Sequence, residues 1–121
     1  MSRLELDTAA LPPALVARPL GDIDMAVTPA LQAELLEAVG EHGATCLVVD
    51  LGAADYIDSS GIELLFRLHG ALSAGSVELI VVAPAGSSAA RLLGMVALSD
   101  IGEIRGSLEE ALQTCAGREP H

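Results

Sequence analysis

The stretch Thr45–Leu72 constrains the fold of this chain more than any other. It begins with an apolar, partly β-branched run, Thr45–Leu51, without alternation of polar and apolar residues, which is typical of a strand buried on both faces. A turn-rich segment, Gly52–Asp58, follows, and then apolar residues recur at helical spacing, which predicts a helix over Ser60–Leu72. The junction delivers Ser59 and Ser60 to one edge of a sheet, where open α/β sheets usually place functional groups.

Strands and helices alternate along the rest of the chain. Residues 3–7 and 14–20 predict two short strands that could form an antiparallel hairpin, with Pro19 at an edge position or a strand end. Gly21–Asp24 is expected to be a loop. The further predicted elements are a helix capped by Thr28 with Pro29 at its first position, a strand over Val77–Ala83, a helix that starts at Gly86-Ser87-Ser88 and continues over Ala89–Val96, a short strand at Glu103–Arg105, and a last helix with a Ser107–Glu110 capping box.

This order predicts the α/β class. The 121 residues are enough for a single core. We expect one domain over residues 1–116 and a flexible tail over 117–121. The sheet should be mainly parallel, with four to five strands, an antiparallel N-terminal edge and about four helices.

The charge of the chain limits its partners. Its formal net charge is −11 at pH 7, from 17 acidic and 6 basic residues, which argues against nucleic acid or an anionic membrane and permits a basic protein partner. Without a long apolar segment or a cationic leader, we expect a cytoplasmic protein with no membrane insertion. We expect no cofactor and no metal ion, because the sequence shows neither a metal-ligand cluster nor a glycine-rich phosphate loop.

The two cysteines lie in different predicted elements. Cys46 falls inside the central strand and Cys115 inside the last helix. We interpret Cys46 as a small buried apolar side chain and Cys115 as an incidental thiol, rather than as a disulfide or a metal pair, because thiols of cytosolic proteins are usually kept reduced.

Three segments carry a resemblance to one known family. Gly21–Asp24 is similar to a G-E-[LI]-D segment before a first helix, Val49–Gly61 to a strand–D-S-[ST]-G–helix signature, and Ser107–Leu112 to a final S-x-E-E-A-L helix. Together they resemble the STAS domain of bacterial anti-sigma factor antagonists over nearly the whole chain. The second segment is fairly specific, and the other two are weak alone. The resemblance implies a STAS-like fold.

The resemblance also implies a phospho-switched binding protein rather than an enzyme. In the family, the first serine after the aspartate is phosphorylated by a kinase that is also the anti-sigma factor; here that serine is Ser59. Ser60 is the second choice and is otherwise expected to cap the helix. The unphosphorylated form would sequester a GHKL-type anti-sigma kinase and so release a sigma factor. A PP2C-type phosphatase would reset the switch.

The chemistry of a serine at a helix start supports a switch at an interface. No residue near Ser59 in sequence would activate its hydroxyl, so a kinase must supply the base and the magnesium. A phosphate adds about −1.5 to −2 charges, and at a helix N-terminus it meets free amides and the positive end of the dipole. We therefore expect it to act mainly by blocking and repelling a partner.

The expected partner contacts surround this serine. At about 100° per residue, Ser59, Glu63 and Phe66 share a stripe that faces away from the core, where an aromatic ring is a favoured interface anchor. Alternatively, Phe66 covers core beside another helix. Asp58 and Asp24 are each either partner contacts or turn, cap or loop carboxylates. The full set of expected contacts is Asp24, Asp58, Ser59, Ser60, Gly61, Glu63 and Phe66.

Three other functions compete with this interpretation. Catalysis would need a base beside the nucleophile, but Ser59 and His69 lie ten positions apart on the predicted helix. A receiver domain phosphorylated on Asp50 would need an acidic pair after the first strand, which the chain lacks. A non-switching STAS subunit or scaffold, such as a partner of a lipid-transport ATPase, stays open as the main alternative.

Overall fold

The fold is a twisted sheet with helices on both faces. The computed structural model describes residues 4–7, 14–94 and 102–117. In chain order its elements are β1 (Leu4–Asp7), β2 (Ala14–Pro19), β3 (Gly21–Ile23), α1 (Thr28–His42), β4 (Cys46–Asp50), β5 (Ala54–Ile57), α2 (Ser59–Ala74), β6 (Glu78–Val82), α3 (Ser88–Leu93), β7 (Glu103–Arg105) and α4 (Leu108–Gly117).

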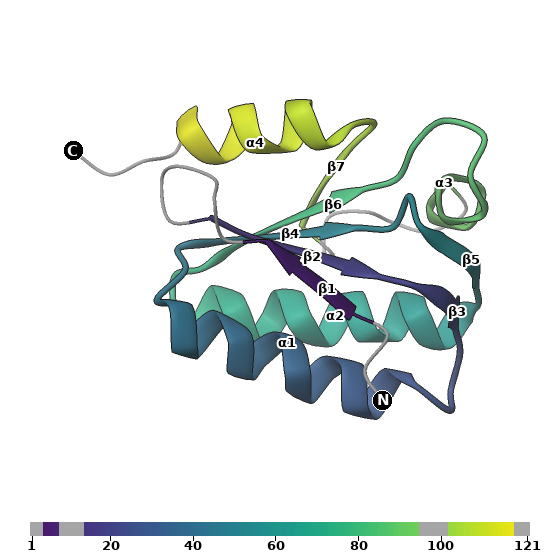
Figure 1. Cartoon of the computed structure of the whole chain (residues 1–121), viewed down its shortest axis with the longest axis horizontal. Helices are drawn as coiled ribbons and strands as arrows, with labels where there is room; N and C mark the ends of the chain where they lie inside the picture. The colour runs from purple at the N-terminus through teal and green to yellow at the C-terminus, as the bar shows by residue number, and fades with distance from the viewer. Residues whose placement is uncertain (1–3, 8–13, 95–101, 118–121) are drawn as a thin grey trace.

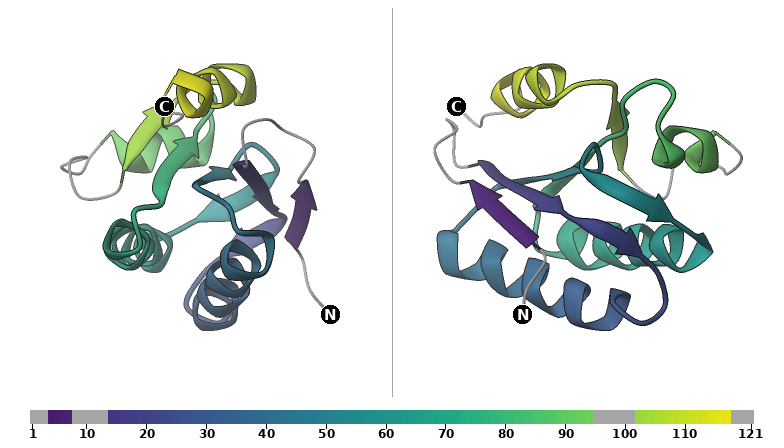
Figure 2. Two further views of the ribbon diagram at one scale, coloured as in Figure 1. Left: turned by 90° about the vertical axis from the view of Figure 1, so that its left-hand side faces the viewer. Right: turned by 45° about the vertical axis from the view of Figure 1, so that its right-hand side comes forward.

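Five strands form the main sheet, in the order β1-β2-β4-β6-β7. β1 is antiparallel to β2, and every other pair of neighbours is parallel. α1 and α2 cover one face of this sheet and α4 covers the other (Figures 1 and 2). The predicted fold class is confirmed: a mainly parallel sheet with an antiparallel N-terminal edge and four helices among the described residues.

The central strand β4 is buried on both faces, as its composition predicted. Leu47 and Val49 belong to the larger core cluster, which lies between the sheet and α1 and α2. Cys46 and Val48 point the other way into a smaller cluster under α4. A strand between two apolar layers needs apolar residues at every position, which explains the missing alternation.

The two long helices bury the residues that their spacing predicted. In α2 the buried side chains include Ile62, Leu65, Leu68 and Leu72. α1 buries one stripe, ends at Gly43 in the left-handed conformation (φ 59°), and leaves its glutamates exposed. Glycine adopts this conformation without the steric cost that a Cβ would add.

Two segments expected to be loops are strands. β3 lies within the predicted loop Gly21–Asp24, and β5 lies within the predicted turn segment Gly52–Asp58. They pair in parallel and form a separate two-stranded sheet, next to the start of α2 in Figure 1. Strands of three and four residues are too short to show periodicity, and each forms only because the other supplies its hydrogen bonds.

The predicted cap of α1 is wrong. The N-cap residue is Val27, which makes no side-chain capping bond, while Thr28 is the first helical residue and is buried. Asp24 takes over this role: its carbonyl accepts the amides of Val27 and Thr28, and its carboxylate accepts the amide of Ala26 at 3.0 Å. Pro29 lies in the first turn, as expected.

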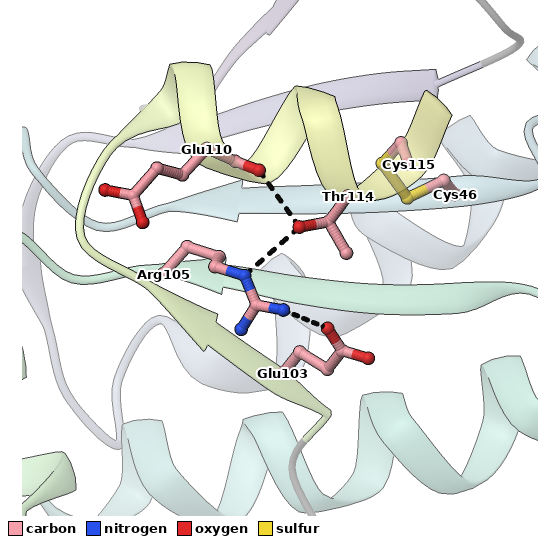
Figure 3. Close-up of a disulfide and its surroundings, with 6 residues drawn as sticks. All are labelled: Cys46, Glu103, Arg105, Glu110, Thr114 and Cys115. Atoms are coloured by element: carbon pink, nitrogen blue, oxygen red, sulfur yellow. Dashed lines mark hydrogen bonds and ion pairs between the residues drawn. A yellow bond between two sulfur atoms is a disulfide. The ribbon is translucent and has the colours of Figure 1, made fainter. Parts of the chain in front are cut away.

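The interpretation of the two cysteines is also wrong. Cys46 and Cys115 form a disulfide that ties α4 to the start of β4, with their Cα atoms 6.1 Å apart (Figure 3). Both residues belong to the smaller core cluster. Redox compartment alone does not reveal this pairing, because it is the fold that brings the two side chains together across a sequence separation of 69.

The C-terminal third follows the prediction closely. Ser87 caps α3 and β7 forms as expected, while the predicted continuation of α3 to Val96 lies outside the described residues. The Ser107 hydroxyl accepts the amide of Glu110 at 3.2 Å. The Glu110 carboxylate reaches back to the Ser107 hydroxyl rather than to its backbone amide. Residues 118–121 of the predicted tail are not described, and its boundary stays a prediction.

Candidate functional site at the start of α2

The two strands of the small sheet bring two aspartates side by side. Ile23 pairs with Ile57, and the amide of Asp58 donates to the carbonyl of Ile23 at 3.3 Å. Asp24 follows one strand and Asp58 follows the other, so the loop into α1 and the start of α2 are neighbours. The sequence-predicted residues Asp24, Asp58 and Ser59 thus come from two segments but meet at one place.

Asp58, and not Ser60, caps α2. Its extended backbone (φ −114°, ψ −170°) precedes the first turn, and its carboxylate accepts the amide of Ser60 at 2.9 Å. The Ser60 hydroxyl donates to the same carboxylate oxygen. The prediction that Ser60 caps the helix is therefore wrong, and the alternative that Asp58 is a cap is confirmed.

The environment of Asp58 keeps its carboxylate ionised. The hydrogen bond from the Ser60 side chain is the largest influence and lowers the pKa of Asp58. Partial burial opposes this shift, and the backbone amides of Ser60 and Gly61 lower the pKa further. A full negative charge at a helix N-terminus also suits the helix dipole.

The two serines differ in what their hydroxyls do. Ser59 is exposed, and its hydroxyl makes no hydrogen bond to any part of the chain that the structure describes. Ser60 is half-buried and its hydroxyl is bound to Asp58. An enzyme approaching from solvent therefore meets Ser59 as the accessible nucleophile of the pair.

Gly61 allows α2 to approach the small sheet closely. A Cβ on Gly61 would lie 2.4 Å from Cγ1 and 2.7 Å from Cδ1 of Ile57, and 3.3 Å from Cγ2 of Ile23. Gly61 is buried, so its place in the signature has a packing reason. Its expected contact with a partner stays a prediction.

The stripe below Ser59 faces solvent. Glu63 and Phe66 are exposed, as the helical spacing predicted, and Phe66 is 36% exposed. Gly70, one turn further along α2, is exposed as well. Glu63 forms a surface ion pair with Arg67 at 3.2 Å. Phe66 therefore offers apolar area on the same side of α2 as the serine.

Two exposed apolar residues near the site were missed by the sequence reasoning. Met25 is 76% exposed and follows Asp24, and Tyr56 is 51% exposed on β5 opposite Asp22. The available signal was their position: Tyr56 is a large apolar residue inside the predicted turn segment Gly52–Asp58, and Met25 directly follows the predicted loop Gly21–Asp24. Exposed large apolar side chains beside a helix start are suited to protein contacts.

The structure gives no support to phosphorylation of Asp50 or to a metal site among the described residues. The Asp50 carboxylate accepts from Arg18 at 3.3 Å and from the amide of Gly52 at 2.9 Å, so its oxygens are engaged in structural bonds. Among the described residues, no three His, Cys, Asp or Glu side chains are arranged to hold a metal ion.

No helix in the described part of the chain is long and apolar enough to cross a membrane.

Comparisons with solved structures agree with this fold. The chain aligns over 96% of its length with 99% of the anti-sigma factor antagonist SpoIIAA in its unphosphorylated form, at 16% identity and a TM-score of 0.68. For the Bacillus cell fate determinant SpoIIAA in its phosphorylated form, the coverage is 93% and 98%, the identity 19% and the TM-score 0.66. For an anti-sigma factor antagonist from Mycobacterium paratuberculosis, the coverage is 92% of both chains, the identity 22% and the TM-score 0.71.

No curated protein matches the sequence. At these identities the structural likenesses establish the shared architecture. The STAS domain profile matches residues 5–111, a span from β1 into α4 that includes both serines. The chain therefore belongs to the STAS domain family.

Proposed function

We propose that this protein is an anti-sigma factor antagonist whose binding is switched off by phosphorylation of Ser59. The observation that carries the proposal is the contrast between the two serines: Ser59 is exposed with an uncommitted hydroxyl, whereas Ser60 is bound to Asp58. In the unphosphorylated state it would bind a GHKL-type anti-sigma kinase and so free a sigma factor. A PP2C-type phosphatase would restore this state.

The geometry suggests how one phosphate would act. The amide of Ser60, in the first turn of α2, already donates to the Asp58 carboxylate, so a phosphate on Ser59 could take that amide only by displacing this bond. The ionised Asp58 beside it repels a second negative charge. The phosphate would therefore point toward a docked partner, where it blocks close packing and repels acidic groups.

The same geometry favours a binding role over catalysis. The exposed stripe of Glu63 and Phe66, with Met25 and Tyr56 nearby, provides contact area around the serine, and no base faces the Ser59 hydroxyl among the described residues. Its structural relatives include SpoIIAA, which has been solved in both a phosphorylated and an unphosphorylated form. That pair of states is the behaviour we propose here.

The proposal is tested by mixing the protein with GHKL-type kinases encoded in the same genome, with ATP and magnesium. Intact-mass analysis should show one added phosphoryl group. Ser59→Ala should abolish it, whereas Ser60→Ala, the matched control, should retain it. With ADP in place of ATP, the kinase cannot phosphorylate the protein, so binding can be measured alone. Under these conditions the wild type should bind the kinase, and Ser59→Asp, which places a negative charge at this position, should not.

Two results would contradict the switch. If no kinase modifies Ser59 and Ser59→Asp binds partners as tightly as the wild type, the protein is a non-switching STAS subunit. If Ser60→Ala alone prevents modification, Ser60 is the target. Treatment of the phosphorylated protein with a PP2C-type phosphatase should return the original mass.

A further inference from the structure

Two adjoining hollows lie along the seam between the edge strand β1 and helix α1. A hollow of about 180 Å³ lies at one end, lined by residues that include Pro19, Val27 and Ala30. A second hollow of about 190 Å³ lies at the other end, lined by Leu6, Ala38 and Glu41 among others. Leu4 and Glu34 line both hollows, so the two are neighbours, and together they are called the groove below.

One wall of the groove is an open strand edge. β1 is the first strand of the main sheet, and among the described residues it pairs only with β2. Its outer backbone groups form a template to which another extended chain can add. The floor beside this edge is apolar, because Leu4 packs against the core and Leu6 leaves 45% of its surface exposed.

The other wall of the groove is acidic. Glu34, Glu37 and Glu41 lie along its rim on α1, a helix that contains no Lys or Arg. The side chains of Glu5 and Asp7 on β1 alternate with those of Leu4 and Leu6, so they face the opposite side of the sheet. Arg18, which lies opposite Glu5 in the strand register, is engaged by Glu5 and Asp50 at 3.3 Å each. The groove therefore combines apolar floor, open backbone and negative charge.

We propose that an extended, basic segment of a partner protein docks in this groove by adding a strand to the outer edge of β1. Its apolar side chains would enter the hollows beside Leu4 and Leu6. Its Lys or Arg side chains would lay their stems on this apolar floor and reach Glu37 and Glu41 on α1. This surface does not depend on Ser59 and is distinct from the switch proposed above.

The lengths of β1 and of the acidic part of α1 both fit a docked strand of a few residues. Four residues of β1 offer about 13 Å of edge at a rise of about 3.3 Å per residue. Glu34 to Glu41 span about 10 Å of helix at about 1.5 Å per residue. One segment of four to five residues can therefore use the strand edge and the acidic wall together.

Charge favours a basic partner over a second copy of this chain as the occupant. Two copies paired edge to edge through β1 would bring two acidic walls together, in a protein whose net charge is −11. Like charges in direct opposition oppose such pairing. A basic segment removes this conflict, and its binding should weaken as salt increases.

The probe for this groove is a fluorescein-labelled octapeptide of alternating Lys and Val, with alternating Lys and Ser as the control of equal charge. Fluorescence anisotropy should show that only the Lys-Val peptide binds the full-length protein. Glu37→Lys combined with Glu41→Lys should weaken binding by at least about tenfold. Asp55→Lys combined with Glu109→Lys, an equal charge change at exposed sites on β5 and α4, should change it by less than about twofold.

A second set of variants tests the apolar floor and the backbone. Leu6→Asp should reduce binding as strongly as the charge reversal. Hydrogen exchange at the β1 amides should slow when the Lys-Val peptide is bound, and N-methylation of alternate peptide amides should abolish binding. Should Leu6→Asp fail to fold, the exposed glutamate variants and the N-methylated peptide still decide the matter.

Several outcomes would overturn the proposal. Equal binding of the Lys-Ser peptide would show a nonspecific charge effect, and retained binding by the Glu37→Lys, Glu41→Lys protein would place the peptide elsewhere. If sedimentation shows a dimer that Leu6→Asp converts to a monomer, a second copy occupies the groove instead. Ser59→Asp should bind the peptide as the wild type does, which separates this test from that of the switch.

Discussion

The Asp58 carboxylate accepts hydrogen bonds from both the amide and the hydroxyl of Ser60. One aspartate thus starts α2 and at the same time engages one of two adjacent serines. Ser59, which has no such bond among the described residues, is left facing solvent. This division of roles follows from the N-cap geometry, in which the side chain bonds to the amide two or three residues ahead.

The cap predicts a pH-dependent contribution to stability. The pKa of Asp58 in the folded protein is lowered from 3.8, so its stabilising contribution is complete above the unfolded-state pKa and is lost as the pH falls through the lower folded-state value. Asp58→Asn keeps the bond from the Ser60 amide but removes the charge. Its Tm should be lower than that of the wild type at neutral pH, and the difference should shrink below about pH 4. Thermal unfolding across this range is the measurement.

The control for this experiment is Asp55→Asn, which removes an exposed carboxylate from β5 without touching a cap. It should not reproduce the pattern. A constant Tm difference between Asp58→Asn and the wild type at every pH would show that the charge of Asp58 does not contribute to the cap.

Two glycines of α2 should respond in opposite directions to alanine. At Gly61 a Cβ would lie 2.4 Å from Ile57, so Gly61→Ala should destabilise the fold by about 1–3 kcal/mol through overpacking. At Gly70 a Cβ would meet nothing within 4 Å, so Gly70→Ala should stabilise the helix by up to about 1 kcal/mol. Urea unfolding of both variants is the measurement, and equal signs would contradict the packing reason for Gly61.

Phe66 and Leu65 separate binding from folding. Leu65 is 1% exposed, and Leu65→Ala should cost about 2–5 kcal/mol of stability through a core cavity. Phe66→Ala should cost only about 1–2 kcal/mol, because part of the ring is already in solvent. If Phe66 anchors the proposed kinase complex, Phe66→Ala should also weaken binding by at least about tenfold in calorimetry.

That binding experiment needs Gly70→Ala as its control, because this change lies on the same stripe but removes no contact surface. It should bind as the wild type does. Unchanged affinity of Phe66→Ala would instead place the partner on another face of the domain.

The disulfide predicts sensitivity to reductant. Joining Cys46 to Cys115 closes a loop with a sequence separation of 69, and the chain-entropy relation gives about 4 kcal/mol for a loop of this length. Dithiothreitol should therefore lower the urea midpoint of the wild type by a corresponding amount. The urea midpoint of the double variant Cys46→Ala, Cys115→Ala should be as low as that of the reduced wild type. It should not change when dithiothreitol is added. If dithiothreitol leaves the urea midpoint of the wild type unchanged, the result would contradict a disulfide between Cys46 and Cys115.

The spacing of apolar residues predicted most of the helices and strands, because this spacing reflects which side of a segment is buried. β4 and β6 lie between two apolar layers, and α1 and α2 each bury one stripe, so their patterns were visible along the chain. β3 and β5 were missed, because strands of three and four residues that stabilise each other leave no such pattern. Met25 and Tyr56 were missed with them.

The sequence alone determined the α/β order, the place of the two serines at the start of the helix that follows the central strand, and the exposed stripe that Phe66 shares with Ser59. These follow from spacing within one segment, which local geometry converts directly into faces and ends. Only the tertiary structure decided that Asp58 engages Ser60, that Cys46 meets Cys115, and that β1 and α1 enclose an acidic groove. Each of these depends on distances between atoms that the chain order leaves open: the rotamer at a helix start, or the contact of segments far apart in sequence.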